Sequence, residues 1–317
     1  MWFSDAVATA AGSQRPENRA AIAALTVTAL LGFAANSLLC RMALHGGAID
    51  AASFTAVRLV SGALVLKLLL ALRGGHRSGG DWKSALALFT YAAAFSIAYV
   101  TIPAGAGALL LFGSVQTTMI VRGLVLGESP RWYEWSGLGL ACAGLIALIS
   151  PGLTAPPLGG GLIMITAGVA WGIYSLRGRN SRDAIANSAG NFQRTLPLCL
   201  PLLLWAYLEA RHAGSGGLHL EVTGLIEAVL SGALASGLGY AVWYTVLPAL
   251  SAMRAAVVQL AVPIVVAAAG AVLLGERPGL RLVCCAAATL GGVALATCYP
   301  LYLKFNRKQQ NEQREIP

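Results

Sequence analysis

Two stripes of aromatic side chains recur at helical spacing in this 317-residue sequence. They consist of Tyr91, Phe95 and Tyr99 in one apolar segment, and of Tyr240, Trp243 and Tyr244 in another. Such rings can stack on a small amphipathic molecule while their hydroxyl and indole groups form hydrogen bonds with it. Aromatic residues also gather where membranes meet water, which is the alternative for Tyr99 and Tyr244 near their segment ends.

Polar and aromatic groups inside other apolar segments complete the candidate binding set. They are Asn36, Gln116, Trp171, Tyr174 and Gln259. A largely apolar wall with a few hydrogen-bonding groups is typical of pockets for small metabolites such as amino acids. We therefore predict one substrate-binding cavity formed by these residues and the two aromatic stripes.

Two arginines are possible charge partners of a substrate. Arg58 and Arg194 each lie inside an apolar segment, where an ionisable group is costly and is a functional candidate for that reason. Each could hold a substrate carboxylate or could extend to the nearer membrane interface. Their position near segment ends favours a structural or interface role. No Asp or Glu stands at the centre of an apolar segment, which argues against proton-coupled export of cationic drugs.

The composition places these residues in a membrane. Only 11% of the residues are charged, against roughly a quarter in soluble domains, while 57% are hydrophobic and the mean hydropathy is +0.69. So few charges cannot cover a soluble surface, and the lipid bilayer must be the main solvent. The net charge of +9 comes from Lys and Arg dispersed between apolar runs, which argues against a nucleic-acid partner.

The sequence predicts neither a catalytic site nor a metal site. The six cysteines lie in apolar segments without metal-ligand spacing, and the four histidines lie in predicted loops. A membrane enzyme would need a nucleophile with a base, a cluster of His and carboxylates, or metal ligands. A channel would need rings of charge or a filter sequence. We expect no cofactor, and a chain that works as a monomer.

Ten apolar runs are long enough to span a bilayer as helices. They lie near 20–40, 51–72, 83–101, 104–126, 132–150, 158–176, 188–209, 223–247, 252–274 and 280–303. With the N-terminus inside, fourteen Lys and Arg residues fall on the inner side and four on the outer side, which is the bias of cytoplasmic loops. The outer four are Arg41, Arg211, Arg277 and Arg281. We predict an all-α integral membrane protein with cytoplasmic tails at residues 1–19 and 304–317.

The chain also repeats itself weakly. The turns Gly127-Glu128-Ser129-Pro130 and Gly275-Glu276-Arg277-Pro278 each lead into an apolar segment with a late glycine, Gly144 or Gly292. Upstream, Tyr99-Val100-Thr101-Ile102-Pro103 matches Tyr244-Thr245-Val246-Leu247-Pro248. Each repeat holds an odd number of helices, so the second must be inverted relative to the first.

Inverted repeats are a recurring architecture of transporters, with the substrate near mid-membrane between the halves. We therefore predict two inverted five-helix repeats at 20–150 and 151–303, with the cavity between them.

With these motifs the chain resembles the drug/metabolite transporter superfamily, and most closely its ten-helix EamA-type branch. The resemblance covers residues 20–303 and is carried by the repeated Gly-Glu-x-Pro turn and by the stretches 111–120, 170–174 and 259–263. It implies a carrier of the bacterial inner membrane, often an exporter of amino acids or related metabolites, with the fifth helix of each repeat peripheral. The YddG-like amino-acid exporters are the best structural comparison.

We predict a secondary transporter that exports small amphipathic metabolites, above all amino acids and including aromatic ones, by alternating access between the repeats. One alternative is a carrier of the same family for other metabolites or drugs. The alternative from another class is a membrane-embedded enzyme that acts on lipid.

Overall fold

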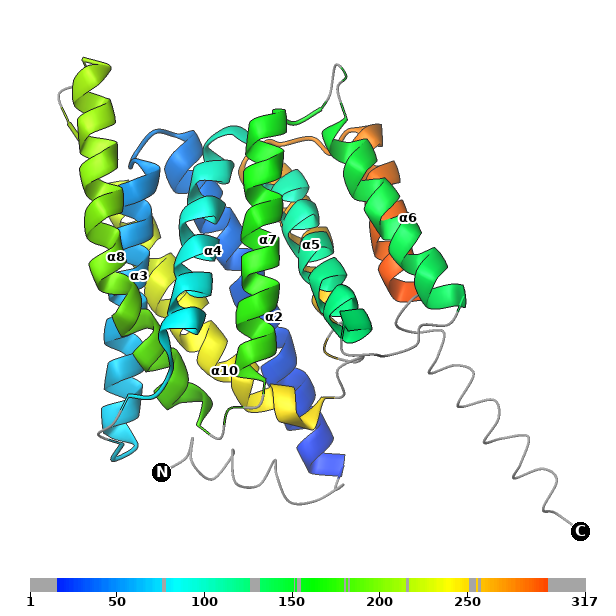
Figure 1. Ribbon diagram of the computed structural model, residues 1–317, viewed down its shortest axis with the longest axis horizontal. Helices are drawn as coiled ribbons and strands as arrows, with labels where there is room; N and C mark the ends of the chain where they lie inside the picture. Colours follow the sequence, from blue (N-terminus) through cyan, green and yellow to red (C-terminus); the bar gives the residue numbers. More distant parts are fainter. Residues whose placement is uncertain are drawn as a thin grey trace, which may run out of the picture.

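The computed structural model describes residues 16–75, 78–125, 132–150, 152, 155–179, 181, 183–214, 217–250, 255 and 258–295, which form a bundle of helices (Figure 1). The first half of the chain forms α2 (Pro16–His45), α3 (Ala51–Leu72), α4 (Trp82–Thr101), α5 (Ala104–Val125) and α6 (Trp132–Ile149). The second half forms α7 (Leu158–Gly178), α8 (Ala184–His212), α9 (Val222–Leu230), η1 (Ser231–Leu238), α10 (Gly239–Val246), η2 (Leu247–Ala249), α12 (Ala261–Leu273) and a last helix, Leu280–Leu295.

These helices make ten spans, because α9, the π-helix η1 and α10 join into one continuous span. Six of the described helices are long and apolar enough to cross a membrane, and shorter apolar helices accompany them. Apart from one isolated bridge between Ile49 and Leu220, no β-structure occurs among the described residues. The predicted all-α membrane fold is therefore confirmed.

Aspartates begin three of the spans. Asp50, Asp81 and Asp183 each accept hydrogen bonds from backbone N–H groups of the turn that follows. These bonds satisfy amides that the first turn of a helix leaves without partners. The caps also fix short loops at the bundle ends, where the two halves of the chain meet.

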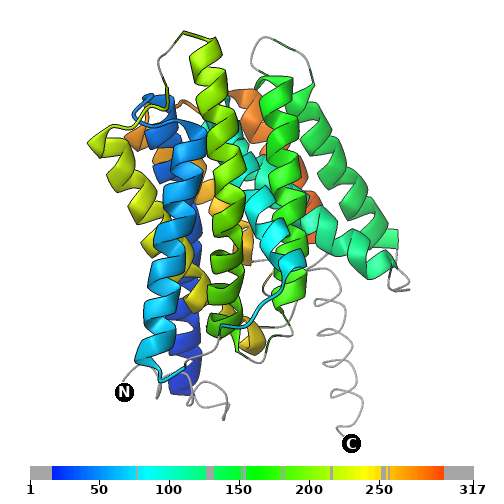
Figure 2. The same cartoon turned by 60° about the vertical axis from the view of Figure 1, so that its left-hand side comes forward.

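The two halves interleave. α4 packs along α7, and α3 packs along α8 and η1, so helices of the first half contact helices of the second along their length. α6 and the last helix lie together at one edge of the bundle, which both views show (Figures 1 and 2). The peripheral place of the fifth helix in each half agrees with the family resemblance.

Different helices of the two halves meet at the two ends of the bundle (Figure 1). The upper end in Figure 1 holds the end of α2 and the start of α3, and the lower end holds the end of α7 and the start of α8. The first Gly-Glu-x-Pro turn at 127–130 and the tail at 304–317 lie outside the described residues, whereas α2 begins at Pro16, inside the predicted N-terminal tail.

Candidate substrate-binding site

Aromatic rings from four helices meet at the centre of the bundle. The rings of Trp171 in α7 and Tyr91 in α4 have centroids 4.9 Å apart, and those of Trp171 and Tyr240 in α10 are 4.7 Å apart. Phe33 of α2 lies against Trp171 at 6.0 Å and against Trp243 at 5.6 Å. At these separations aromatic pairs attract one another. The two predicted stripes are thus joined through Trp171.

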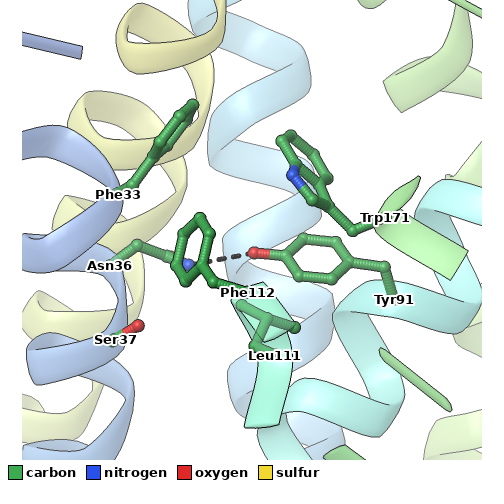
Figure 3. Close-up of a pocket in the computed structure, with 7 residues that line it drawn as sticks. All are labelled: Phe33, Asn36, Ser37, Tyr91, Leu111, Phe112 and Trp171. Carbon is green, nitrogen blue, oxygen red and sulfur yellow. Dashed lines mark hydrogen bonds between the residues drawn. The ribbon is translucent and has the colours of Figure 1, made fainter. Parts of the chain in front are cut away.

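A small cavity opens within this cluster (Figure 3). Its wall consists of Phe33, Asn36, Ser37, Tyr91, Leu111, Phe112 and Trp171. The free space holds roughly one water molecule. In this conformation the cavity is therefore too small for a metabolite.

Hydrogen bonds tie the cavity wall together across the halves. The Asn36 amide donates to the Tyr91 hydroxyl at 3.1 Å, a contact drawn in Figure 3. The Ser231 hydroxyl of η1 donates to the side-chain oxygen Oδ1 of Asn36 at 2.7 Å. Arg58 of α3 donates to the Tyr91 hydroxyl at 3.0 Å and to the Ser236 hydroxyl at 3.1 Å. These buried groups thus form one connected network, which fixes the orientation of Asn36 and Tyr91.

The sequence analysis missed Ser231 and Ser236. Both lie in the π-helix, where each backbone N–H bonds five residues back rather than four. This wider turn places two serines that are five residues apart on the side that faces Asn36 and Arg58. The segment Ser231–Leu238 holds small residues and no proline, and its composition carries no signal that separates it from an α-helix. π-helical segments often occur at functional sites.

The remaining predicted aromatic residues form a buried shell around the cavity. The Phe95 ring lies 4.7 Å from that of Tyr99, and the Tyr174 ring lies 6.3 Å from that of Tyr244. All four side chains are buried, and so is that of Trp243. They support the wall rather than line the cavity in this conformation.

The two predicted glutamines differ in their surroundings. Gln116 is buried in α5. Gln259 is also buried, but its amide donates to the Ala255 carbonyl of the preceding turn at 3.2 Å. Neither residue is part of the cavity wall in this conformation.

The structure separates the two arginines that the sequence analysis grouped. Arg58 is only 1% exposed and lies beside the cavity, so the alternative that it extends to the membrane interface is wrong. Arg194 instead donates to the carbonyl oxygens of Gly79 at 2.7 Å and Gly190 at 2.9 Å, at the lower end. The structure therefore favours a structural role for Arg194 and leaves Arg58 alone in the centre.

The lower end is closed by a polar junction between the halves. Arg177 at the end of α7 pairs with Asp81 at 2.8 Å and donates to the Ser84 hydroxyl at 2.8 Å. The Asp81 backbone N–H donates to the Asn191 side chain of α8 at 3.0 Å. Burial raises the pKa of Asp81, but the hydrogen bonds from Ser84 and Arg177 outweigh it and hold the pKa below its usual range.

The upper end is closed by a second ion pair. Nε of Arg41 lies 2.8 Å from Oε1 of Glu276, and Oε2 of Glu276 accepts the Ala104 backbone N–H at 2.6 Å. Arg41 also donates to the Tyr99 carbonyl at 2.8 Å. We expected Arg41 in an outer loop; this placement is wrong, because α2 continues to His45 and Arg41 is buried within it. The Glu of the second Gly-Glu-x-Pro turn thus joins α12 to α2 and α5.

Among the described residues, no group of three or more His, Cys, Asp or Glu side chains is arranged to hold a metal ion.

Comparison with known proteins shows the family to which this chain belongs. The EamA-like transporter family model matches the chain twice, at residues 20–150 and 158–298. The chain belongs to this family and is a multi-pass membrane transporter built from two repeats.

Two kinds of relatives are found beyond the family model. A Pseudomonas aeruginosa protein, described as uncharacterized, is 54% identical over 86% of this chain and 92% of its own length. A protein of Salmonella typhimurium named as a probable amino-acid metabolite efflux pump is 27% identical over 57% of this chain and 63% of its own length. An Escherichia coli protein with the same name is 24% identical over 55% of this chain and 61% of its own length.

Among the solved structures with a similar fold is a crystal structure with a TM-score of 0.60 at 19% identity, and the match covers 90% of this chain and 99% of the other.

Proposed function

We propose that this chain is a secondary transporter that exports small amphipathic metabolites, above all amino acids, across the bacterial inner membrane. The observation that carries the proposal is the central cavity, which combines aromatic walls with the Asn36 amide and the Tyr91 hydroxyl at the meeting of the two halves. Aromatic amino acids suit it, since their rings can stack on Trp171 while their polar ends reach the network. The two efflux-pump relatives support the same substrate class.

Alternating access follows from the two junctions at the ends of the bundle. The upper junction rests on Arg41 and Glu276, and the lower junction on Asp81 and Arg177. In the described conformation both are formed and the cavity is closed to a metabolite. We propose that opening one junction at a time exposes the cavity to one side of the membrane and then to the other.

Orientation completes the proposal. The bias of Lys and Arg supports an orientation with the lower end and both termini in the cytoplasm and the upper end facing outward. Export then begins with opening at the Asp81 junction and ends with opening at the Glu276 junction. We propose further that the chain works as a monomer, since helices of one copy suffice to form the cavity wall.

Uptake into liposomes tests the substrate class. Purified protein in proteoliposomes is offered each radiolabelled amino acid of a complete panel, with and without a proton gradient. We expect saturable uptake of several, strongest for aromatic ones, over protein-free liposomes. A panel without saturable uptake would contradict the proposal. Turnover of a bilayer lipid by the same preparation would favour the membrane enzyme, and uptake of other metabolites or drugs alone would favour the broader carrier.

A further inference from the structure

Arg58 is a buried cation that has no anionic partner in the part of the chain that the structure describes. Its side chain is 1% exposed, and each hydrogen bond that it donates goes to a neutral hydroxyl. Among the described residues no carboxylate forms an ion pair with it. A buried cation of this kind is costly in a membrane and marks a functional site by default.

The surroundings orient the guanidinium but leave part of it available. Its central carbon lies 5.1 Å from the ring centroid of Tyr91 and 5.0 Å from that of Phe95, within the range of cation–π attraction. Nη2 makes a short bond to Tyr91 and a long one of 3.4 Å to the Tyr240 hydroxyl. Nη1 makes no hydrogen bond within the described residues. One edge of the guanidinium fork therefore lacks an acceptor.

The guanidinium is one hydroxyl group away from the cavity. Tyr91 lines the cavity and accepts hydrogen bonds from both Asn36 and Arg58 at the same oxygen. The other contacts of Arg58, to Ser236 and Tyr240, cross from the first half of the chain to the second. Movement of the halves apart, as the proposed transport requires, would lengthen these contacts and free donors of the guanidinium.

From this arrangement we infer that Arg58 is the carboxylate anchor of the transported solute, so that the substrates are acids and zwitterions rather than neutral or purely cationic molecules. The inference rests on the proposed transport function and names its substrate class. A carboxylate matches the fork of a guanidinium with two parallel hydrogen bonds. It would replace the long Tyr240 contact, supply the acceptor that Nη1 lacks and neutralise the buried charge.

The first arm of the test uses the unaltered protein and matched ligands. L-phenylalanine and L-leucine are each compared with their C-terminal amides, which keep the side chain and the amino group but lack the carboxylate. Binding is measured by ligand-induced thermal stabilisation of the purified protein, and transport by competition for uptake into proteoliposomes. We expect the amides to act at concentrations about 10- to 100-fold higher than the acids.

The second arm removes the charge. Arg58→Gln should weaken binding of the acids by about 10- to 100-fold and leave that of the amides unchanged, so that the discrimination disappears. A merely structural arginine would instead lower the affinity for both ligands alike. Arg211→Gln is the matched control, because Arg211 is an exposed arginine on the neighbouring Tyr207 ring. Arg58→Lys keeps the charge but loses the guanidinium fork. Its affinity for the acids should lie between those of the unaltered protein and Arg58→Gln.

The outcomes separate this inference from the proposed function. Equal action of acids and amides on the unaltered protein would overturn the anchor and leave amino-acid transport standing, whether or not Arg58→Gln folds. Loss of acid and amide binding together in a folded Arg58→Gln protein would also overturn it. No action by any acid or amide would overturn the transport proposal, and the anchor with it.

Discussion

Gly144 in α6 and Gly292 in the last helix pack in reciprocal fashion, each against the other's helix. A methyl group at Gly144 would lie 2.9 Å from the backbone nitrogen of Thr289, and one at Gly292 would lie 2.5 Å from the carbonyl oxygen of Gly137. The shift in residue number that relates Glu128 to Glu276 also relates Gly144 to Gly292. The same shift relates Gly137 to Cys285 and Ala141 to Thr289, the residues on which these glycines pack. The contacts are thus symmetric between the repeats.

We predict that Gly292→Ala destabilises the protein and that Gly291→Ala does not. The added methyl at 292 meets backbone atoms that cannot turn aside, whereas nothing lies within 4 Å at 291. Overpacking of this kind costs about 1–3 kcal/mol, so the melting temperature in detergent should fall only for Gly292→Ala. Gly144→Ala and Gly139→Ala form the same pair on α6. Equal melting temperatures within both pairs would refute this close packing.

Removal of the Glu276 carboxylate from the upper junction should lower stability and open the cavity to the outside. Glu276→Gln leaves the buried Arg41 guanidinium without its ionic partner and should cost about 3–5 kcal/mol, since the pair is largely buried. It should also make the cavity more accessible from outside, which a membrane-impermeant thiol reagent on a cysteine introduced at Ser37 can measure. Glu221→Gln is the control. Glu221 and its partner His219 are both exposed, so loss of this pair should change stability little. Unchanged labelling in Glu276→Gln would argue against a gate at this pair.

The lower junction predicts a specific dependence on pH. The folded-state pKa of Asp81 is lowered by hydrogen bonds from Ser84 and by Arg177, so these contacts stabilise the protein above the unfolded-state pKa of about 4. This contribution is lost as the pH falls through the lower folded-state pKa. Asp81→Asn, which can still cap α4, should therefore melt at a lower temperature than the unaltered protein from pH 5 to 8. Below that range the melting temperatures of the two proteins should converge. A difference in melting temperature that grows as the pH falls would contradict this prediction.

If substrate binds in the cavity, replacing single side chains in or near it should slow transport. Tyr240→Ala and Gln116→Ala should insert into the membrane at normal levels but transport more slowly, Tyr240→Ala by about tenfold, since 1.4 kcal/mol of lost binding is tenfold in affinity. Tyr207→Ala is the control, an exposed tyrosine on α8. The amount of folded protein is matched by gel filtration before rates are compared. Normal rates in both variants would remove this site.

The large features of the fold were predictable from the sequence, because a segment that crosses the bilayer must be a long apolar helix. Long apolar runs separated by charges predict the spans, and the repeated Gly-Glu-x-Pro turn predicts two inverted halves. Tyr91 and Tyr240 were predicted because each belongs to an aromatic stripe at helical spacing, and Trp171 because it lies inside another apolar segment. The structure brings the rings of all three together.

Other features depend on tertiary packing that no local pattern carries. Arg41 and Glu276 are far apart in the sequence, and each looks like an ordinary residue near a span end. Ser231 and Ser236 acquire their role only because the span there winds as a π-helix. For Arg58 a structural or interface role was favoured over that of a charge partner, because its distance from the segment end says nothing of the helices that cover it.

Counterflow tests the central claim, a carrier with one cavity that faces the two sides in turn. Proteoliposomes are loaded with an unlabelled amino acid that the uptake panel identifies, and entry of the labelled form is followed against empty proteoliposomes. The account predicts that internal substrate accelerates entry and drives a transient accumulation of label. Entry at the same rate with and without internal substrate, without overshoot, would contradict it and indicate a pore.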